Sequence, residues 1–172
     1  MTRGGRVHDH GMAPDLLAVA ERVGRRLTER GETVGVAEGS CGGLVSAALL
    51  AVPGASAYYA GGAIIYTLAA NRAFLEGAIP TPPGLRGATE EFASYLARSA
   101  VARLGSTWGI GEGGAAGPTG NRYGDPAGHA WLAVAGPADA TRHVLTGAAD
   151  RLGNMTAFAA AALGLLAAQF DR

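Results

Sequence analysis

Lysine is absent from this 172-residue sequence, in which all fourteen basic residues are arginine. Any mechanism that needs a lysine amine as a base or as a covalent carrier is therefore excluded. Cysteine occurs once, as Cys41. A single cysteine excludes a disulfide within the chain and fits a reducing compartment.

The chain also lacks an excess of one charge and a long apolar run. Its formal net charge is zero and its arginines are scattered, so neither a nucleic-acid surface nor an anionic-membrane patch is indicated. The longest apolar stretch, residues 155–170, is interrupted and falls short of the roughly 20 residues of a membrane span. Residues 1–13 are polar and do not resemble a signal peptide. We therefore expect a cytoplasmic protein whose partner is a small molecule, not nucleic acid or a membrane.

Aromatic residues are scarce at 6%, although 48% of the residues are hydrophobic and 28 are glycine. Alanine supplies much of the apolar content, which favours close-packed helices on a sheet over a bulky aromatic core. The length suits one domain with a sizeable core. We expect residues 1–13 to form a flexible leader and residues 14–172 to form a single domain.

Helical and strand-like patterns alternate along the chain. Apolar residues at helical spacing from Leu16 to Leu27 predict a first helix that ends near Gly31. The expected helices cover residues 14–31, 43–52, 67–75, 89–104 and 154 onward, and the expected strands cover 34–37, 58–66, 108–111, 128–135 and 142–146. The last two strands suit a hairpin, and residues 112–127 are expected to form a long loop. This alternation predicts a three-layer α/β/α sandwich with a largely parallel central sheet.

Two glycine-rich loops follow predicted strands. Gly42 and Gly43 stand at the start of a predicted helix, where backbone amides attract anions, so they form a candidate ligand-binding turn; a plain turn is the alternative. The loop over residues 112–120 also follows a strand, and the two loops could face one cleft. Neither has the Gly-Lys-Ser/Thr of a P-loop or the glycine spacing of a dinucleotide site. ATP-driven chemistry is therefore disfavoured.

No group of cysteines and histidines has the spacing of metal ligands. His8, Asp9 and His10 lie in the polar leader, where a solvated tail explains them better than a metal site. His129 and His143 fall on predicted strands, where histidines are more often structural. The sequence therefore predicts no metal site.

A series of short motifs runs in order through nearly the whole chain. They are Ala37-Glu38, Gly42-Gly43, Val52-Pro53-Gly54-Ala55-Ser56-Ala57-Tyr58, Gly61-Gly62-Ala63-Ile64-Ile65-Tyr66, Ala116-Gly117-Pro118, Pro126-Ala127-Gly128 and Trp131-Leu132-Ala133. Through these motifs the chain resembles the CinA carboxy-terminal domain, a family that includes nicotinamide mononucleotide deamidases. The ordered series is far more specific than any single glycine pair, and the family's α/β fold agrees with the one predicted above.

The resemblance implies a reaction and a set of contact residues. The implied reaction is hydrolysis of the carboxamide of nicotinamide mononucleotide, giving nicotinate mononucleotide and ammonia without a metal or another cofactor. The resemblance also implies a nucleotide-sized cleft and a homo-oligomer. The positions that match the family's motifs make Gly42, Gly43, Gly117 and Pro118 the candidate substrate-binding residues.

The catalytic positions depart from the family's pattern. The family uses a serine in Ala-Glu-Ser-Cys-Thr-Gly-Gly with a tyrosine and a lysine in Tyr-Ser-Asn-x-Ala-Lys. Here the serine falls on Gly39, the tyrosine is kept as Tyr66, and the lysine falls on Asn71. A neutral hydroxyl needs a neighbouring base, and no lysine is available. A threonine of the family's second loop is replaced by Gly113, which removes a hydroxyl. The family's Gly-Asp-Arg signature is replaced by Gly-Ala-Ala at residues 147–149, unless Asp150-Arg151 take the place of its aspartate and arginine.

Ser40 offers a way to retain a nucleophile. If Gly39 bulges, which glycine would permit, Ser40 takes the place of the family's serine, with Tyr66 or a water as its activator. Ser40 and Tyr66 are therefore the candidate catalytic residues. Cys41 is another candidate, but a lone thiol needs a basic partner, so a small buried residue is its favoured role.

Three functions remain open. Losing a nucleophile or its base typically lowers turnover on the order of a millionfold. The first hypothesis is therefore a degenerate CinA-type domain that keeps a nucleotide-sized cleft with weak or no amidase activity. The second is an active nicotinamide-nucleotide amidase that uses Ser40 and Tyr66, and the third is a non-catalytic interaction protein.

Overall fold

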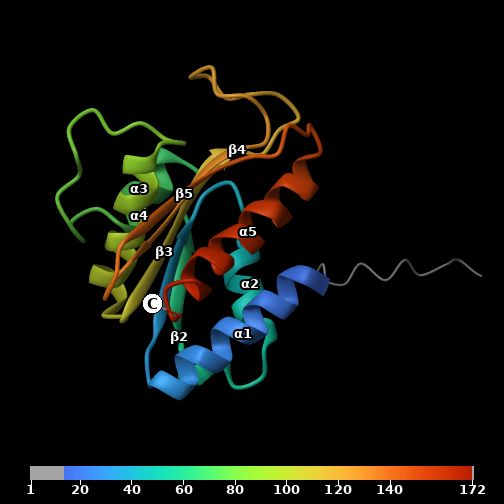
Figure 1. Ribbon diagram of the computed structural model, residues 1–172. Helices are drawn as coiled ribbons and strands as arrows, with labels where there is room; N and C mark the ends of the chain where they lie inside the picture. The colour runs from blue at the N-terminus through green and yellow to red at the C-terminus, as the bar shows by residue number, and fades with distance from the viewer. Residues whose placement is uncertain (1–13, 172) are drawn as a thin grey trace, which may run out of the picture.

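The computed structural model describes residues 14–171. The expected leader, with His8, Asp9 and His10, lies outside these residues. The described part is a sheet with helices on both faces (Figure 1). Its elements are α1 (Pro14–Arg30), β1 (Val34–Glu38), α2 (Leu44–Ala51), a 3-10 turn (Ala55–Ala57), β2 (Tyr59–Ile64), α3 (Leu68–Phe74), α4 (Glu90–Leu104), β3 (Trp108–Ala115), β4 (His129–Ala135), β5 (Ala140–Leu145) and α5 (Arg151–Ala167).

The five strands lie in the order β2-β1-β3-β4-β5. β1 pairs in parallel with both β2 and β3, whereas β4 runs antiparallel to β3 and to β5. Four of the five strands therefore point the same way, and β4 alone is reversed. This confirms the predicted α/β fold with a sheet that is mostly, but not wholly, parallel. The predicted hairpin is β4 and β5.

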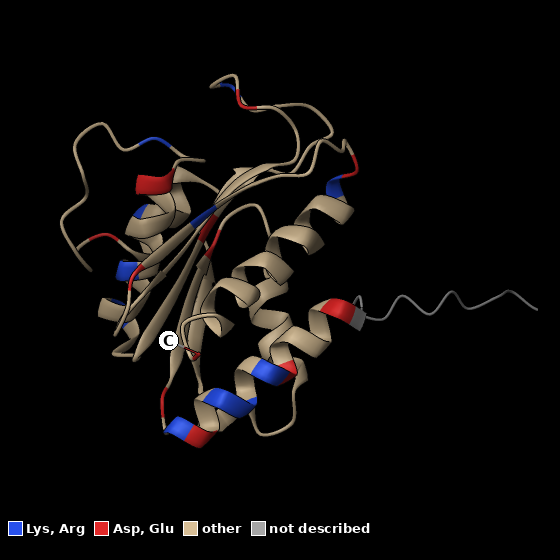
Figure 2. Ribbon diagram, in the orientation of Figure 1, with Lys and Arg blue, Asp and Glu red and all other residues tan. Residues whose placement is uncertain are grey.

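Helices α1, α2 and α5 cover one face of the sheet, and α4 covers the other (Figure 1). The core on the first face joins α1 to α5 through aliphatic residues and alanines, with Trp108, Tyr58 and Phe158 as its large aromatic side chains. The helical spacing from Leu16 to Leu27 is confirmed, since these residues of α1 are buried. Arginine and acidic residues are interspersed along the remaining surface of α1 (Figure 2).

A row of glycines lets α4 lie directly on β3. Gly109, Gly111 and Gly113 alternate along the strand and share its α4 face. A Cβ on Gly111 would overlap the carbonyl oxygen of Ala93, and one on Gly109 would overlap that of Ala97. The backbones of helix and strand are thus in contact, which is the close packing that the alanine and glycine content predicts.

The prediction of a loop from residue 112 was wrong in its first four residues. β3 continues to Ala115 because Gly113 pairs with Trp131 and Ala115 with His129 of β4. Glycine and alanine have little intrinsic preference for a strand, so the neighbouring strand decides their conformation. As a result Glu112, at the predicted loop boundary, lies inside the sheet.

None of the helices within residues 14–171 combines the length and the hydropathy that crossing a membrane would require. Over the same residues, no three side chains of histidine, cysteine, aspartate or glutamate are grouped so that they could hold a metal ion.

Candidate functional site

A cavity of about 790 Å³ lies beyond the carboxyl ends of β1 and β2, beside the end of β3. Its wall includes Ser40, Tyr66, Asn71, Phe92, Arg122 and Tyr123. Open α/β sheets bind ligands at this edge, and the volume lies in the range of small-molecule sites. The structure thus brings the two candidate catalytic residues, Ser40 and Tyr66, and the lysine-equivalent Asn71 to one cavity.

A buried carboxylate from β3 holds the loop that carries Ser40. Glu112 is fully buried, and its side chain accepts hydrogen bonds from the backbone N–H groups of Gly39 (3.0 Å) and Cys41 (2.8 Å) and from the Ser40 hydroxyl. Burial raises the pKa of the Glu112 carboxyl above its ordinary value, although the hydrogen bonds from Ser40 and Cys41 lower it. Among the described residues, the partner of the Ser40 hydroxyl is therefore Glu112 and not Tyr66.

A second buried carboxylate occupies the start of α2. Glu38, which pairs with Glu112 in the β1–β3 register, accepts hydrogen bonds from the N–H groups of Val45 and Ser46, both at 3.0 Å, and from the Ser46 hydroxyl at 2.7 Å. These N–H groups belong to the first turn, where the helix dipole attracts negative charge. The anion attraction expected at Gly42 and Gly43 is thus satisfied by the chain's own carboxylate.

The glycines around Ser40 differ in what they provide. Gly42 and Gly43 have φ values of 64° and 102°, which glycine adopts readily and other residues rarely. Gly39 has no such φ; a Cβ there would lie 3.3 Å from the carbonyl oxygen of Glu112. The unusual backbone expected at Gly39 is therefore found at the two following glycines, and Gly39 provides close packing against β3.

Tyr66 is held at the edge of the cavity by an arginine from α5. The Tyr66 hydroxyl accepts a hydrogen bond from Arg151 Nη2 at 3.4 Å, and Arg151 Nη1 donates to the Gly117 carbonyl at 2.6 Å. Arg151 therefore joins the segment after β2 to the loop after β3. Of the pair that could substitute for the family's Gly-Asp-Arg, Arg151 reaches the candidate site, whereas Asp150 occupies the N-cap of α5.

The four candidate substrate-binding residues do not line this cavity. Gly117 is buried and Pro118 is exposed, while Gly42 is exposed and Gly43 half-buried. A ligand inside the cavity would contact Ser40 and Tyr66, whereas it would have to extend beyond the cavity to contact any of the four predicted binding residues. Their role in binding stays a prediction.

Cys41 is enclosed in the core beside the two buried carboxylates. Burial, and then the charges of Glu112 and Glu38, raise the pKa of its thiol well above the ordinary range. We predict that the native protein reacts with Ellman's reagent at pH 8 far more slowly than the urea-unfolded chain. Because only the thiolate reacts, the rate should fall about tenfold for each unit by which folding raises the pKa of Cys41. A native rate equal to that of the unfolded chain would show that the loop opens in solution.

The loop after β3 places charged and aromatic side chains on the cavity wall. Asp125 forms an ion pair with Arg86 (2.7 Å) and accepts a hydrogen bond from the side-chain amide of Asn121 (2.8 Å). The hydrogen bond from Arg86 lowers the pKa of Asp125. The Tyr123 ring lies 4.9 Å from the guanidinium groups of both Arg86 and Arg122. These contacts tie the loop to the segment before α4.

The two strand histidines bond to each other and to the cavity wall. His143 Nε2 lies 2.9 Å from His129 Nδ1, and His129 Nε2 lies 2.9 Å from the carbonyl oxygen of Ala88. Because a carbonyl oxygen only accepts, His129 Nε2 donates to Ala88, and in the neutral ring His129 Nδ1 then accepts from His143. Ala88 lines the cavity and has a φ of 59°, so the histidine pair supports an unusual backbone at that wall.

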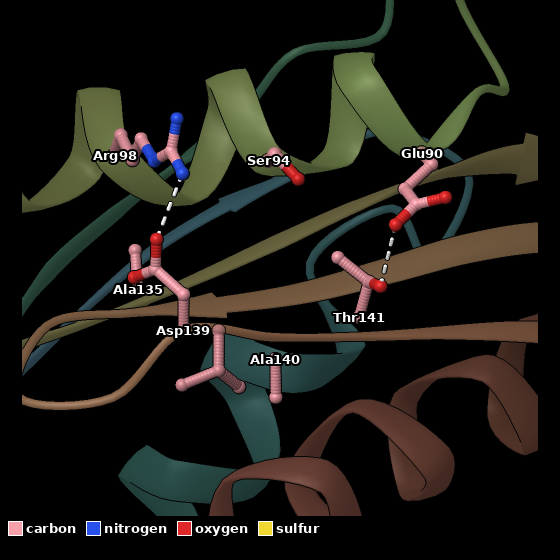
Figure 3. A pocket seen from close by; sticks show the side chains of 8 residues that line it. Glu90, Ser94, Arg98, Ala135, Asp139, Ala140 and Thr141 are labelled. Carbon is pink, nitrogen blue, oxygen red and sulfur yellow. Dashed lines mark hydrogen bonds and ion pairs between the residues drawn. The ribbon is translucent and has the colours of Figure 1, made fainter.

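A smaller cavity of about 330 Å³ lies between α4 and the β4–β5 hairpin (Figure 3). Its polar side chains bond to each other: Arg98 pairs with Asp139 at 2.8 Å, and Thr141 donates to Glu90 at 2.7 Å. Both members of the ion pair are more than half exposed. Exposed pairs of this kind contribute little to stability, and the polar groups already satisfy one another.

Three site residues were missed in the sequence. Glu38 ends β1 and Glu112 lies opposite it within β3. Two carboxylates inside apolar segments are a signal, because buried carboxylates need partners. The strand register that places Glu38 opposite Glu112 could not be predicted from the sequence. Arg122 gave no local signal, since its importance depends on which other charges line the cavity.

Comparison with known proteins agrees with this three-layer α/β domain. The model of the CinA C-terminal domain family matches residues 16–170. The chain is 41% identical over 111 residues to a CinA-like protein of Prochlorococcus marinus strain MIT 9313, covering 64% of this chain and 26% of that protein. It is 38% identical over 146 residues to a CinA-like protein of Anaeromyxobacter sp. strain K, covering 81% and 35%.

Solved structures agree with the same assignment. The competence/damage-inducible protein of Agrobacterium tumefaciens superposes with a TM-score of 0.84 at 26% identity, covering 94% of this chain and 99% of that one. A CinA superfamily protein of Klebsiella pneumoniae gives a TM-score of 0.83 at 25% identity, covering 91% and 98%. The chain belongs to the CinA C-terminal domain family. It spans about a third or less of the length of the first CinA-like relatives.

Proposed function

We propose that this domain binds a nucleotide of the size of nicotinamide mononucleotide in the 790 Å³ cavity and lacks the Ser–Lys amidase chemistry of its family. The composition of the wall carries the proposal: Tyr66 is kept, but the lysine-equivalent position is Asn71, and the hydroxyl of Ser40 is bonded to Glu112. Asparagine cannot take a proton at neutral pH, so the family's base has no equivalent there.

Binding and hydrolysis are tested together. Nicotinamide mononucleotide is expected to raise the melting temperature of the purified protein, because a ligand at a hundredfold excess over its Kd stabilises a fold by about 2.7 kcal/mol. Ammonia release should not exceed that of a buffer control. The absence of any shift with pyridine and purine mononucleotides would overturn the proposal and favour the interaction role.

A second candidate function, hydrolysis of the same carboxamide, is favoured by the Ser40–Glu112 hydrogen bond. A carboxylate whose pKa is raised is a better base for a serine hydroxyl. In that case Ser40 would attack the carboxamide carbon, ammonia would leave, and water would release nicotinate mononucleotide. Ammonia release that disappears in Ser40→Ala but persists in the control Ser94→Ala would establish hydrolysis and contradict the binding-only proposal.

A cytoplasmic location and a homo-oligomer are part of the same proposal. The homo-oligomer is what the family membership implies, and the cytoplasmic location rests on the single cysteine, which fits a reducing compartment. Sedimentation of the full chain at several concentrations measures the assembly state. A monomer at every concentration would contradict the proposed homo-oligomer.

A further inference from the structure

We infer that Arg122 binds a phosphate group of the ligand and so restricts the cavity to ring-bearing phosphate esters, the class of nucleoside monophosphates. This inference rests on the proposed function, because it names the ligand class and a contact residue of the same cavity.

The wall has one charged side chain. Of the seventeen lining residues, Arg122 alone is charged, and no aspartate or glutamate is among them. A cationic ligand would meet an unopposed positive charge, whereas an anionic ligand would neutralise it. The cavity is therefore electrostatically suited to an anion.

The Arg122 guanidinium is available for such a contact. None of the ion pairs between residues 14 and 171 includes Arg122. Its one side-chain hydrogen bond there is from Nη2 to the Tyr123 hydroxyl at 2.7 Å. A guanidinium has five N–H donors in a planar fork that matches the oxygens of phosphate. Four donors are thus left for a ligand.

The acidic residue nearest in sequence does not compete for Arg122. Asp125 is already paired with Arg86 and bonded to Asn121. The Tyr123 ring contacts both guanidinium groups and keeps Arg86 on Asp125 and Arg122 on the cavity wall. The positive charge of Arg122 therefore remains uncompensated, and its loop is already positioned when a ligand arrives.

The rest of the wall suits a flat ring with polar substituents. Tyr66, Phe92 and Tyr123 supply aromatic surface, and Asn71 and Thr81 supply groups that both donate and accept hydrogen bonds. Aromatic surface together with one arginine matches a base or pyridine ring that carries a phosphate, and it fits neither an aliphatic acid nor a free inorganic ion.

The test compares phosphorylated and unphosphorylated probes by calorimetry. The wild-type chain should bind nicotinamide mononucleotide and AMP at least about 10-fold more tightly than nicotinamide riboside and adenosine. Arg122→Gln should lose this preference by weakening both monophosphates about 10-fold, while adenosine is unchanged and nicotinamide riboside, whose ring is a cation, binds no more weakly. Arg142→Gln, which removes an exposed arginine of β5 that does not line the cavity, should behave as wild type.

The outcomes separate this inference from the proposed function. Binding of AMP but not of nicotinamide mononucleotide, with the loss confined to Arg122→Gln, would support the phosphate contact and contradict the pyridine ligand. An unchanged preference in Arg122→Gln would overturn the role of Arg122 while leaving nucleotide binding intact. Equal binding of nucleosides and monophosphates by the wild type, or no binding of any monophosphate, would overturn the inference itself.

Discussion

Glu112→Leu is expected to lower the free energy of unfolding by about 2 kcal/mol or more, because leucine cannot accept the hydrogen bonds from the Ser40 hydroxyl and the Cys41 N–H. The Gly39 N–H keeps the backbone carbonyl of residue 112 as its acceptor. Each buried donor left without a partner costs roughly 1–3 kcal/mol. Removing a buried charge offsets part of this loss. Urea-induced unfolding at neutral pH measures the change. An unfolding midpoint equal to that of the wild type would show that Glu112 does not organise the Ser40 loop.

Glu112→Gln is the matched control, and it separates the structural role of Glu112 from its charge. A glutamine oxygen can accept from the N–H groups of Gly39 and Cys41 while its amide donates to the Ser40 hydroxyl, so all three contacts persist. We expect its stability to lie within about 1 kcal/mol of wild type. Since the amide is not a base, this variant should also abolish any hydrolysis that depends on Ser40.

The stability of the wild type should depend on pH in a way that the stability of Glu112→Gln does not. The pKa of Glu112 is raised in the folded state, so above pH 4.5, the ordinary value for glutamate, the folded state holds a proton that the unfolded chain has lost. Stability therefore falls as the pH rises from 4.5 through the folded pKa. The wild type should lose stability over this window relative to Glu112→Gln. A constant difference between the two proteins would contradict the raised pKa.

Gly111→Ala should have an effect of similar size for a different reason. The added methyl would overlap the Ala93 carbonyl oxygen, a backbone atom of α4 that cannot move without the helix. Overpacking typically costs about 1–3 kcal/mol, and a clash with backbone belongs at or above the upper end of that range. Gly164→Ala is the control, because nothing lies near its added methyl in α5. It should stabilise the protein by about 0.5–1 kcal/mol, as measured by thermal unfolding.

Local signals were enough to predict most of the helices and strands. Thr89 accepts a hydrogen bond from the N–H of Phe92, and Thr67 accepts one from that of Ala70, so both predicted helix starts are confirmed by side-chain caps. The end of β3 was not predictable, because its small residues depend on pairing with β4. Strand pairing joins residues far apart in the chain, and no local pattern encodes it.

The candidate site was predictable in position but not in chemistry. The loop after β1 and Tyr66 do share a cavity, as the order of motifs indicated. The partner of Ser40, however, is a carboxylate more than seventy residues away, on a strand whose register set the contact. The absence of lysine excluded one base, and only the packing of β1 on β3 showed which acidic group stands beside the hydroxyl.

The buried carboxylates of Glu38, at the end of β1, and Glu112, within β3, lie at one end of the cavity. Ser40 is buried and Glu112 lies behind it, whereas Arg122 is exposed at the outer wall. Glu38 already accepts the hydrogen bonds of the first amides of α2, and among the described lining residues the cationic side chain is that of Arg122. A phosphorylated ligand is therefore expected to enter ring first, with its ring toward Ser40 and its phosphate facing solvent, so that any group joined to the phosphate could project outward without having to fit inside the protein.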